Sequence, residues 1–169
     1  MNLDLRELTE FPAEVILESE ADSNEYGIEG IAFRDLMKIR LNIQKVDNEY
    51  YCHGTVAAPV EQECSRCLSL FENDLTGDLS FSVRMQEVKP AQAYDEEGEI
   101  FFVRSGEPIL ELNEIIRQSL ILSLPLKPLC HQDCKGLCPN CGVNLNEESC
   151  DCKDEETDER WEGLRGLLE

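Results

Sequence analysis

Two neighbouring stretches in the first half of the chain alternate between apolar and polar residues. In residues 37–44 every second side chain is apolar, and the side chains between them are charged or carry an amide. A period of two places the apolar side chains on one face of a β-strand. Asp47 and Asn48 then supply residue types of a tight turn, and residues 50–60 return to the alternating pattern. We therefore predict an antiparallel hairpin with one face on a core.

Further strands are predicted on both sides of this hairpin. Residues 79–85 alternate in the same way, and residues 13–20 contain an apolar stretch that suits a strand. The polar, glycine-containing residues 22–30 are predicted to form a loop. Strands in this order, joined by turns, favour an antiparallel sheet.

A helix is predicted after the strands. Apolar residues recur at helical spacing over residues 111–124, behind glutamates whose charge suits a helix N-terminus, and Pro125 ends the run. This helix is expected to cover the sheet. Together the elements predict an α+β body over residues 1–126, with an acidic, flexible insert near residues 87–99.

The C-terminal part of the chain, residues 127–169, follows a different pattern. Residues 130–152 contain six cysteines but little apolar periodicity, so this stretch cannot build a hydrophobic core of its own. We predict that a metal ion organises it. Trp161, Leu164 and Leu168 then recur at helical spacing, which predicts a short amphipathic helix at the end of the segment.

The chain is strongly acidic, with 36 Asp and Glu against 15 Lys and Arg and a net charge of −21. Such a charge repels a phosphate backbone over most of the surface, so broad RNA binding is not expected. It attracts basic proteins, and ribosomal proteins are an abundant class of these. Direct contact with RNA would be limited to local patches around Arg66, Lys135 and Lys153.

The N-terminal residues and the cysteine content indicate the compartment. Residues 1–10 alternate in charge and lack the apolar run of an export signal, and residues 120–126 are far shorter than the roughly 20 apolar residues of a membrane span. We expect a cytoplasmic protein without membrane association. In that reducing compartment, nine cysteines indicate metal ligation or thiol chemistry rather than a disulfide framework.

The strongest motif is a zinc knuckle at residues 138–142, with the sequence CPNCG. Two residues between the cysteines and a glycine after them let backbone amides turn toward the sulfurs and offset their charge. A closed four-thiolate site needs a second pair of cysteines, and two nearby pairs compete for that role. For a single structural zinc ion we rank the ligands as Cys138 and Cys141 first, then Cys150 and Cys152, then Cys134 and Cys130.

A further pair, Cys64 and Cys67, follows the predicted hairpin with the same two-residue gap. Two interpretations stay open. The pair is either a reduced dithiol packed at the end of a strand, or part of a second four-thiolate site, for which the chain has enough cysteines. Cys52 lies within a predicted strand and is expected to be buried there, while His131 is an alternative ligand beside Cys130.

A redox enzyme and a catalytic zinc site are competing interpretations of these cysteines. A thioredoxin-type motif begins a helix in a parallel unit, whereas Cys64 and Cys67 follow an antiparallel pattern. A catalytic zinc keeps an open position and needs a general base, so thiol-rich clusters in a chain with two histidines favour a closed structural site. The sequence contains no phosphate-binding loop or nucleophile elbow. We expect no catalytic activity and no small-molecule substrate.

Several motifs resemble, in order and spacing, those of the bacterial YceD family of large ribosomal RNA subunit accumulation proteins. The resembling segments are residues 63–67 (ECSRC), 120–125 (LILSLP), 130–142 (CHQDCKGLCPNCG), 144–146 (NLN), 150–152 (CDC) and 158–161 (DERW) with Leu164. The resemblance extends from residue 37 onward. It implies that Cys64 and Cys67 are the more general mark of the family, and that the C-terminal cysteine cluster belongs to a zinc-binding subgroup.

The resemblance also implies a role in ribosome biogenesis, through accumulation of large-subunit ribosomal RNA, with no established catalytic activity. Together with the charge, it predicts an acidic zinc-binding adaptor for a basic ribosomal or assembly protein. A regulatory or sequestering protein for a non-ribosomal basic partner is the alternative among binding proteins, because charge alone does not identify the partner. A CxxC redox protein is the alternative from the enzyme class.

Overall fold

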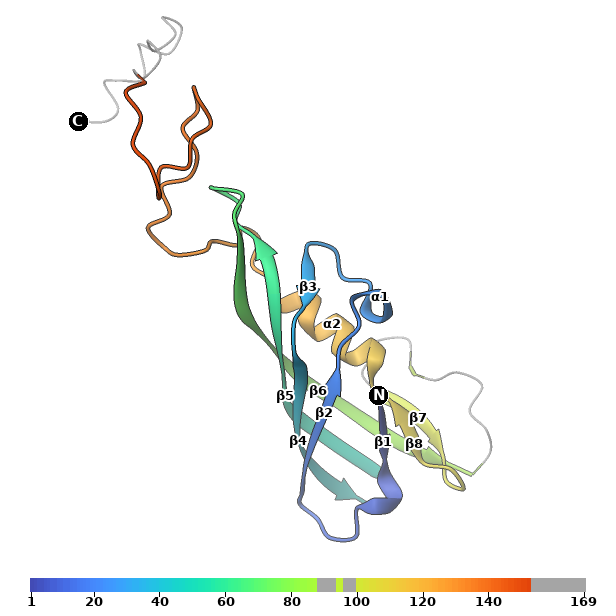
Figure 1. Ribbon diagram of the computed structural model, residues 1–169. Helices are drawn as coiled ribbons and strands as arrows, with labels where there is room; N and C mark the ends of the chain where they lie inside the picture. The colour runs from blue at the N-terminus through green and yellow to red at the C-terminus, as the bar shows by residue number, and fades with distance from the viewer. Residues whose placement is uncertain (88–93, 96–99, 153–169) are drawn as a thin grey trace, which may run out of the picture.

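The body of the protein is a six-stranded sheet with a helix packed on one face (Figure 1). The computed structural model describes residues 1–87, 94–95 and 100–152. The strands lie in the order β2-β4-β5-β6-β7, and β3 pairs separately with β5. Their bounds are β2 (Ala13–Glu20), β3 (Ile31–Phe33), β4 (Leu36–Val46), β5 (Glu49–Glu63), β6 (Leu70–Gln86) and β7 (Ile100–Arg104).

The predicted hairpin is confirmed as β4 and β5. Val46 pairs with Glu49, so Asp47 and Asn48 form a two-residue turn, and Asp47 has the positive φ of 53° that such turns require. Alternate residues of β4 are buried, as the pattern of apolar residues predicts. The predicted strand over residues 13–20 is confirmed as β2, which pairs with β4 in antiparallel register.

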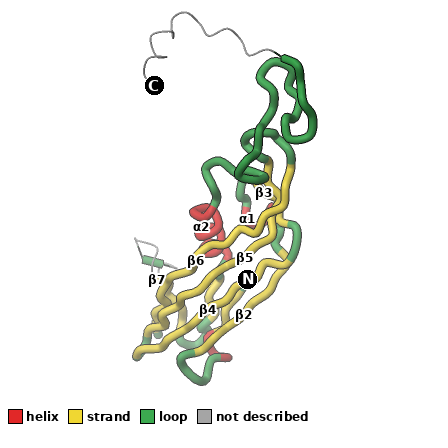
Figure 2. The backbone as a smooth tube through the Cα atoms, turned by 90° about the vertical axis from the view of Figure 1, so that its left-hand side faces the viewer, coloured by secondary structure: helices red, strands yellow, loops and turns green. Residues whose placement is uncertain are grey.

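Strands β5 and β6 form a long ribbon that extends beyond the rest of the sheet (Figures 1 and 2). Their antiparallel register runs from Glu49 opposite Arg84 to Glu63 opposite Leu70. Strand β6 therefore begins well before residue 79, where the alternation of apolar residues predicts its start. The tip of this ribbon is the connection between the two strands, residues 64–69, and it contains Cys64 and Cys67.

The sheet is mixed rather than wholly antiparallel. All its pairings are antiparallel except that of β7, which runs parallel to β6 at the edge of the sheet. A parallel neighbour requires the chain to return to the starting end of the strand before pairing, which a short turn cannot do. Strand β6 ends at Gln86 and β7 begins at Ile100, so the two strands are not joined by a short turn. The acidic, flexible insert predicted near residues 87–99 falls largely outside the described residues.

Short elements that the sequence pattern does not predict complete the body. Strands β1 (Asn2–Asp4) and β8 (Ile109–Glu111) pair in a small antiparallel sheet, and a 3-10 turn, η1 (Leu5–Glu7), follows β1. A single helical turn, α1 (Ser23–Tyr26), lies within residues 22–30, which were predicted to form a loop. These elements are too short for hydrophobic periodicity to reveal them.

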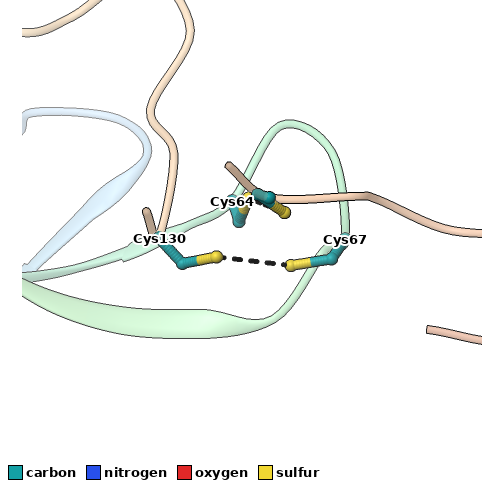
Figure 3. Close-up of side chains that lie close together, drawn as sticks. Cys64, Cys67 and Cys130 are labelled. Carbon is teal, nitrogen blue, oxygen red and sulfur yellow. Dashed lines mark hydrogen bonds between the residues drawn. The ribbon is translucent and has the colours of Figure 1, made fainter. Parts of the chain in front are cut away.

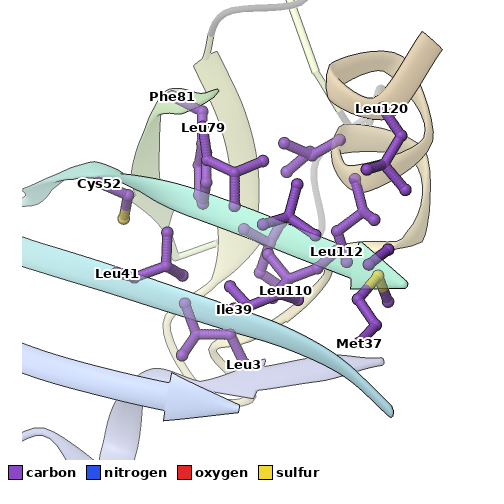
Figure 4. Packing of buried hydrophobic residues seen from close by; sticks show 14 of the residues in the cluster. Leu3, Met37, Ile39, Leu41, Cys52, Leu79, Phe81, Leu110, Leu112 and Leu120 are labelled. Carbon is purple, nitrogen blue, oxygen red and sulfur yellow. The ribbon is translucent and has the colours of Figure 1, made fainter. Parts of the chain in front are cut away.

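The predicted covering helix is confirmed as α2 (Asn113–Ser123), which packs on β6. It buries Ile116 and Leu120 completely against the sheet, in the core drawn in Figure 4. The hydroxyl of Ser119 donates a hydrogen bond to the carbonyl oxygen of Asp78, which joins the helix to the strand. Within the described residues, no helix is long and apolar enough to cross a membrane.

Beyond α2 the chain leaves the core and reaches the tip of the β5–β6 ribbon, as Figure 1 shows for the orange segment. The backbone N–H of Ser65 donates to the carbonyl oxygen of Pro128 at 2.8 Å, so the segment is attached to the tip. The cysteine-rich residues 130–152 follow. The helix predicted around Trp161, Leu164 and Leu168 lies outside the described residues.

Candidate metal centres

Four cysteines from two distant parts of the chain meet at the ribbon tip. Cys64 and Cys67 come from the β5–β6 connection, and Cys130 and Cys134 come from the segment after α2; we call these four the inner cluster. The sulfur atoms of Cys64 and Cys134 are 3.7 Å apart, as are those of Cys67 and Cys130 (Figure 3). All four sulfurs lie within 4.8 Å of one another.

These distances fit a tetrahedral metal ion. Four thiolates bound to zinc at about 2.3 Å place neighbouring sulfurs about 3.8 Å apart. A disulfide would instead bring two sulfurs to about 2.05 Å. Cys64 and Cys67 each also have a sulfur of the other segment at 3.7 Å, so the contacts join the two segments. The inner cluster therefore has the geometry of a four-thiolate metal site.

A second group of four cysteines follows in the same segment. Cys138, Cys141, Cys150 and Cys152 also have all their sulfurs within 4.8 Å of one another, and we call them the outer cluster. The two clusters differ in exposure. Cys64, Cys67 and Cys134 of the inner cluster are buried, whereas Cys141 and Cys152 of the outer cluster are exposed.

The two clusters are built on the same backbone turn. In the outer cluster the N–H of Gly142 donates to the carbonyl oxygen of Cys138, and in the inner cluster the N–H of Leu68 donates to that of Cys64, both at 2.9 Å. Gly142 has a φ of 75° and Leu68 a φ of 58°. Leu68 thus adopts the left-handed conformation that usually requires glycine.

Replacing Leu68 with glycine is expected to stabilise the protein by about 1 kcal/mol, because the left-handed conformation costs a side-chain-bearing residue about that much or more. The leucine side chain is 55% exposed, so little burial is lost. Urea unfolding measures the change. Leu70→Gly is the control, since Leu70 is equally apolar and 65% exposed but lies in a strand, where glycine destabilises. Equal loss of stability in both variants would contradict the prediction.

In the inner cluster the pKa of one thiol is lowered by backbone amides, and the pKa of a neighbouring thiol is raised. Burial opposes ionisation of Cys64, but the backbone N–H groups of Cys67, Cys130 and Arg66 point at its sulfur and lower its pKa to about 6. Burial, followed by hydrogen bonds to the sulfurs of Cys134, Cys64 and Cys67, raises the pKa of Cys130 to about 12. A bound cation is what allows all four thiols to ionise together.

The outer cluster likewise contains one thiol with a lowered pKa and one with a raised pKa. Backbone N–H groups of Cys141 and Asn140 lower the pKa of Cys138 to about 6. A hydrogen bond with the sulfur of Cys141, together with partial desolvation of the Cys152 sulfur among the other cluster atoms, raises the pKa of Cys152 to about 12. Each cluster thus combines a thiolate at neutral pH with a thiol that ionises only if the charge beside it is offset.

Two residues singled out from the sequence have structural places beside the inner cluster. The guanidinium of Arg66, predicted as part of an RNA-binding patch, donates to the carbonyl oxygen of Cys134 at 2.8 Å and so holds the cysteine segment on the tip. The Nδ1 of His131 lies 3.1 Å from the sulfur of Cys130. The predicted patch also included Lys135 and Lys153, and Lys153 lies outside the described residues.

The structure assigns cysteine partners that the sequence left open. Cys150 and Cys152 lie with Cys138 and Cys141, whereas Cys130 and Cys134 lie with Cys64 and Cys67 rather than beside the outer cluster. The inner cluster joins segments between which β6, β7, β8 and α2 all lie in the sequence, so local spacing does not reveal it. Cys52 belongs to neither cluster and is fully buried in β5, where burial raises the pKa of its thiol to about 12.

Comparison with known proteins identifies relatives of the chain. The family described as "Large ribosomal RNA subunit accumulation protein YceD" matches residues 52–168. Uncharacterized proteins of Mycobacterium bovis and Mycobacterium tuberculosis are each 35% identical over 145 residues, which cover 84% of this chain and 68% of the relative. No solved structure matches the chain.

A plant protein carries a functional name. The "Large ribosomal RNA subunit accumulation protein YCED homolog 1, chloroplastic" of Arabidopsis thaliana is 37% identical over 60 residues, which cover 36% of this chain and 19% of the plant protein. Its namesake in Zea mays is 33% identical over 96 residues, covering 56% of this chain and 31% of the relative. The similarity therefore covers only part of this chain and only part of each plant protein.

Proposed function

The chain belongs to the YceD family of large ribosomal RNA subunit accumulation proteins, and from this premise we propose that it is a ribosome biogenesis factor. In this proposal it promotes the accumulation of large-subunit ribosomal RNA in the cytoplasm, as an acidic zinc-binding adaptor without catalysis. The names of the family and of the plant relatives support the role in large-subunit RNA.

The observation that carries the zinc-binding part of the proposal is the pair of four-cysteine clusters at one end of the sheet. We assign each cluster one structural zinc ion, held by Cys64, Cys67, Cys130 and Cys134 in the inner cluster and by Cys138, Cys141, Cys150 and Cys152 in the outer cluster. Zinc bound there supplies folding free energy to a segment with few apolar residues. Four thiolates close each site, which argues against a catalytic metal with an open position.

Charge supports a basic protein as the partner. Several cations of the body are used within it, as in the ion pairs of Arg34 with Glu61, Lys38 with Glu18 and Arg84 with Glu49. On the β5–β6 ribbon Glu61 lies directly opposite Glu72, and the ion pair of Arg34 with Glu61 offsets only part of this like charge. A basic partner would offset this charge, and its binding would weaken steeply with salt.

Direct contact with RNA is limited in this proposal. Arg66 already donates to a backbone carbonyl of the cysteine segment, so less of its hydrogen-bonding capacity is available to a phosphate. Four thiolates around a divalent ion also leave a net negative charge at each cluster. Any contact with RNA is therefore expected around Lys135 and Lys153 alone.

Two alternatives give different results in the same experiments. A sequestering protein for a non-ribosomal basic partner would show the salt dependence without any change in ribosomal RNA. A redox protein would form a reversible disulfide between Cys64 and Cys67. The Cys64–Cys67 motif lies at a hairpin tip rather than at the start of a helix, a setting that favours metal binding over redox chemistry.

The proposed function is tested by depleting the protein from the cells that make it and measuring the ratio of large-subunit to small-subunit ribosomal RNA. The ratio is expected to fall, and the unaltered chain is expected to restore it. Complementation by a chain with Cys64 and Cys67 replaced by serine then shows whether the inner metal site is needed to restore this ratio. An unchanged ratio on depletion would refute the role in large-subunit RNA.

Zinc binding is expected to release protons and to weaken as the pH falls. Cys130 and Cys152, with pKa values raised to about 12, are protonated in the metal-free protein at neutral pH, and each must lose its proton to bind zinc. Below a pH of about 6 Cys64 and Cys138 are protonated as well, so the affinity falls more steeply there. A pH-indicator titration at pH 7.5 should record at least one proton per zinc ion; no release would contradict the assigned ligands.

A further inference from the structure

Asn146 lies in the loop of the outer cluster but contacts a ligand of the inner cluster. We propose that Asn146 is a positioning residue of the inner metal site and that it couples the two sites, so that zinc in the outer cluster raises the affinity of the inner cluster. This inference rests on the proposed zinc ions and adds a dependence of one site on the other.

The side chain of Asn146 makes two contacts across the junction of the clusters. Its Nδ2 donates to the sulfur of Cys134 at 3.3 Å, and its Oδ1 accepts a hydrogen bond from the backbone N–H of Lys135 at 2.8 Å. The side-chain amide of Asn146 thus binds both Cys134, a proposed metal ligand, and Lys135, the next residue in the sequence. An N–H donor at a thiolate reduces the charge on sulfur and fixes the orientation of the ligand.

Asn144 holds Asn146 in this position. The Oδ1 of Asn144 accepts hydrogen bonds from the backbone N–H of Asn146 at 3.1 Å and from its Nδ2 at 2.8 Å. The Nδ2 of Asn144 donates to Glu147 in the same loop and reaches Ser69 of the ribbon tip at 3.4 Å. The backbone N–H of Leu145 also donates to the carbonyl oxygen of Gly136 at 2.9 Å.

The ends of this loop are ligands of the outer cluster. Residues 142–149 connect Cys141 to Cys150, so a metal ion there closes the loop and keeps Asn146 beside Cys134. Without that ion the loop has more conformations, and ordering it to reach Cys134 costs free energy. Binding of one ion therefore favours binding of the other, and the coupling is equal in both directions.

Exposure determines which ion leaves first. Three ligands of the inner cluster are 5% exposed or less, whereas Cys141 and Cys152 are open to solvent. A chelator or proton therefore reaches the outer sulfurs more readily. Loss of the outer ion then loosens Asn146 and weakens the inner site, which makes metal loss a two-step process.

The test uses the full chain and a chromophoric zinc chelator. Asn146→Asp keeps an oxygen acceptor for Lys135 but removes the donor to Cys134, so the inner site is expected to bind zinc 10- to 100-fold more weakly. Asn146→Ala gives a second measurement if the aspartate prevents folding. Glu148→Gln, at an exposed position of the same loop, is the control and should leave the affinity unchanged. Equal inner-site affinity in the Asn146 variants and the control would overturn the proposal.

The coupling is tested by removing the outer site. Cys141→Ser with Cys152→Ser is expected to weaken the inner site as Asn146→Asp does, and the combined variant should be no weaker than either alone. Unchanged inner affinity after loss of the outer ligands, or simple addition of the two effects, would overturn the coupling while leaving two zinc ions in place. Absence of zinc from the inner cluster of the unaltered chain would instead refute the proposed function's metal assignment.

Discussion

Replacing Cys64 and Cys67 together with serine is expected to lower the bound zinc from two ions per chain to one and to detach the cysteine segment from the ribbon tip. Zinc binding at four-thiolate sites is worth on the order of 10 kcal/mol in apparent free energy. Hydrogen bonds would remain, from Ser65 to Pro128, from Arg66 to Cys134 and from Asn144 to Ser69, and each contributes about 1 kcal/mol. They cannot replace the ion.

Native mass spectrometry measures the zinc, and limited proteolysis between α2 and residue 130 measures the detachment. The matched control is Cys138→Ser with Cys141→Ser, which removes the outer ion but leaves the inner ligands and the attachment to the ribbon. That control should keep one zinc ion at saturating metal and resist cleavage. If both pairs of replacements gave the same cleavage, the inner cluster would not be the attachment of the segment.

Replacing Gly77 with alanine is expected to destabilise the body by about 2 to 3 kcal/mol, because α2 crosses β6 too closely for a side chain. A Cβ at this position would lie 2.3 Å from the hydroxyl oxygen of Ser119 and 2.9 Å from its carbonyl oxygen. The hydroxyl can rotate, at the cost of its hydrogen bond to Asp78, but the helix backbone must move away from the sheet.

Thermal or urea unfolding of the metal-loaded protein measures this loss. Gly106→Ala is the control, since the nearest atom to a Cβ there is 4.0 Å away, at the end of the Arg104 side chain. The control should change the free energy of unfolding by less than about 1 kcal/mol. A Gly77→Ala variant as stable as the control would mean that the helix does not pack on β6 at this distance.

Sequence periodicity predicted the elements that bury one face. Strand β4 could be predicted because its alternate side chains are buried. Helix α2 could be predicted because it buries one stripe of apolar side chains along its length. The outer part of the β5–β6 ribbon was missed. Glu72, Asn73 and Asp74 are all exposed there, so neither face of the strand has a continuous apolar row.

Pairing between residues far apart in the sequence was the second feature that the sequence could not predict. Nothing in residues 100–104 distinguishes a parallel neighbour of β6 from an antiparallel one, because direction is decided by the path of the connection. The same limit applies to the cysteines. Spacing identified the outer cluster, whose ligands are close in sequence, but the partners of Cys64 and Cys67 come from beyond α2. Asn146 was part of a recognised motif, yet only its contact with Cys134 gives it a role.

We propose that two closed four-thiolate zinc sites organise one end of this YceD-family protein. The most direct measurement is native mass spectrometry of the full chain purified under reducing conditions, before and after treatment with a thiol-alkylating reagent. We expect two zinc ions per chain, with all eight cluster thiols protected from alkylation until the metal is removed. A chain without zinc whose cluster thiols react freely, or one with a disulfide between Cys64 and Cys67, would contradict it.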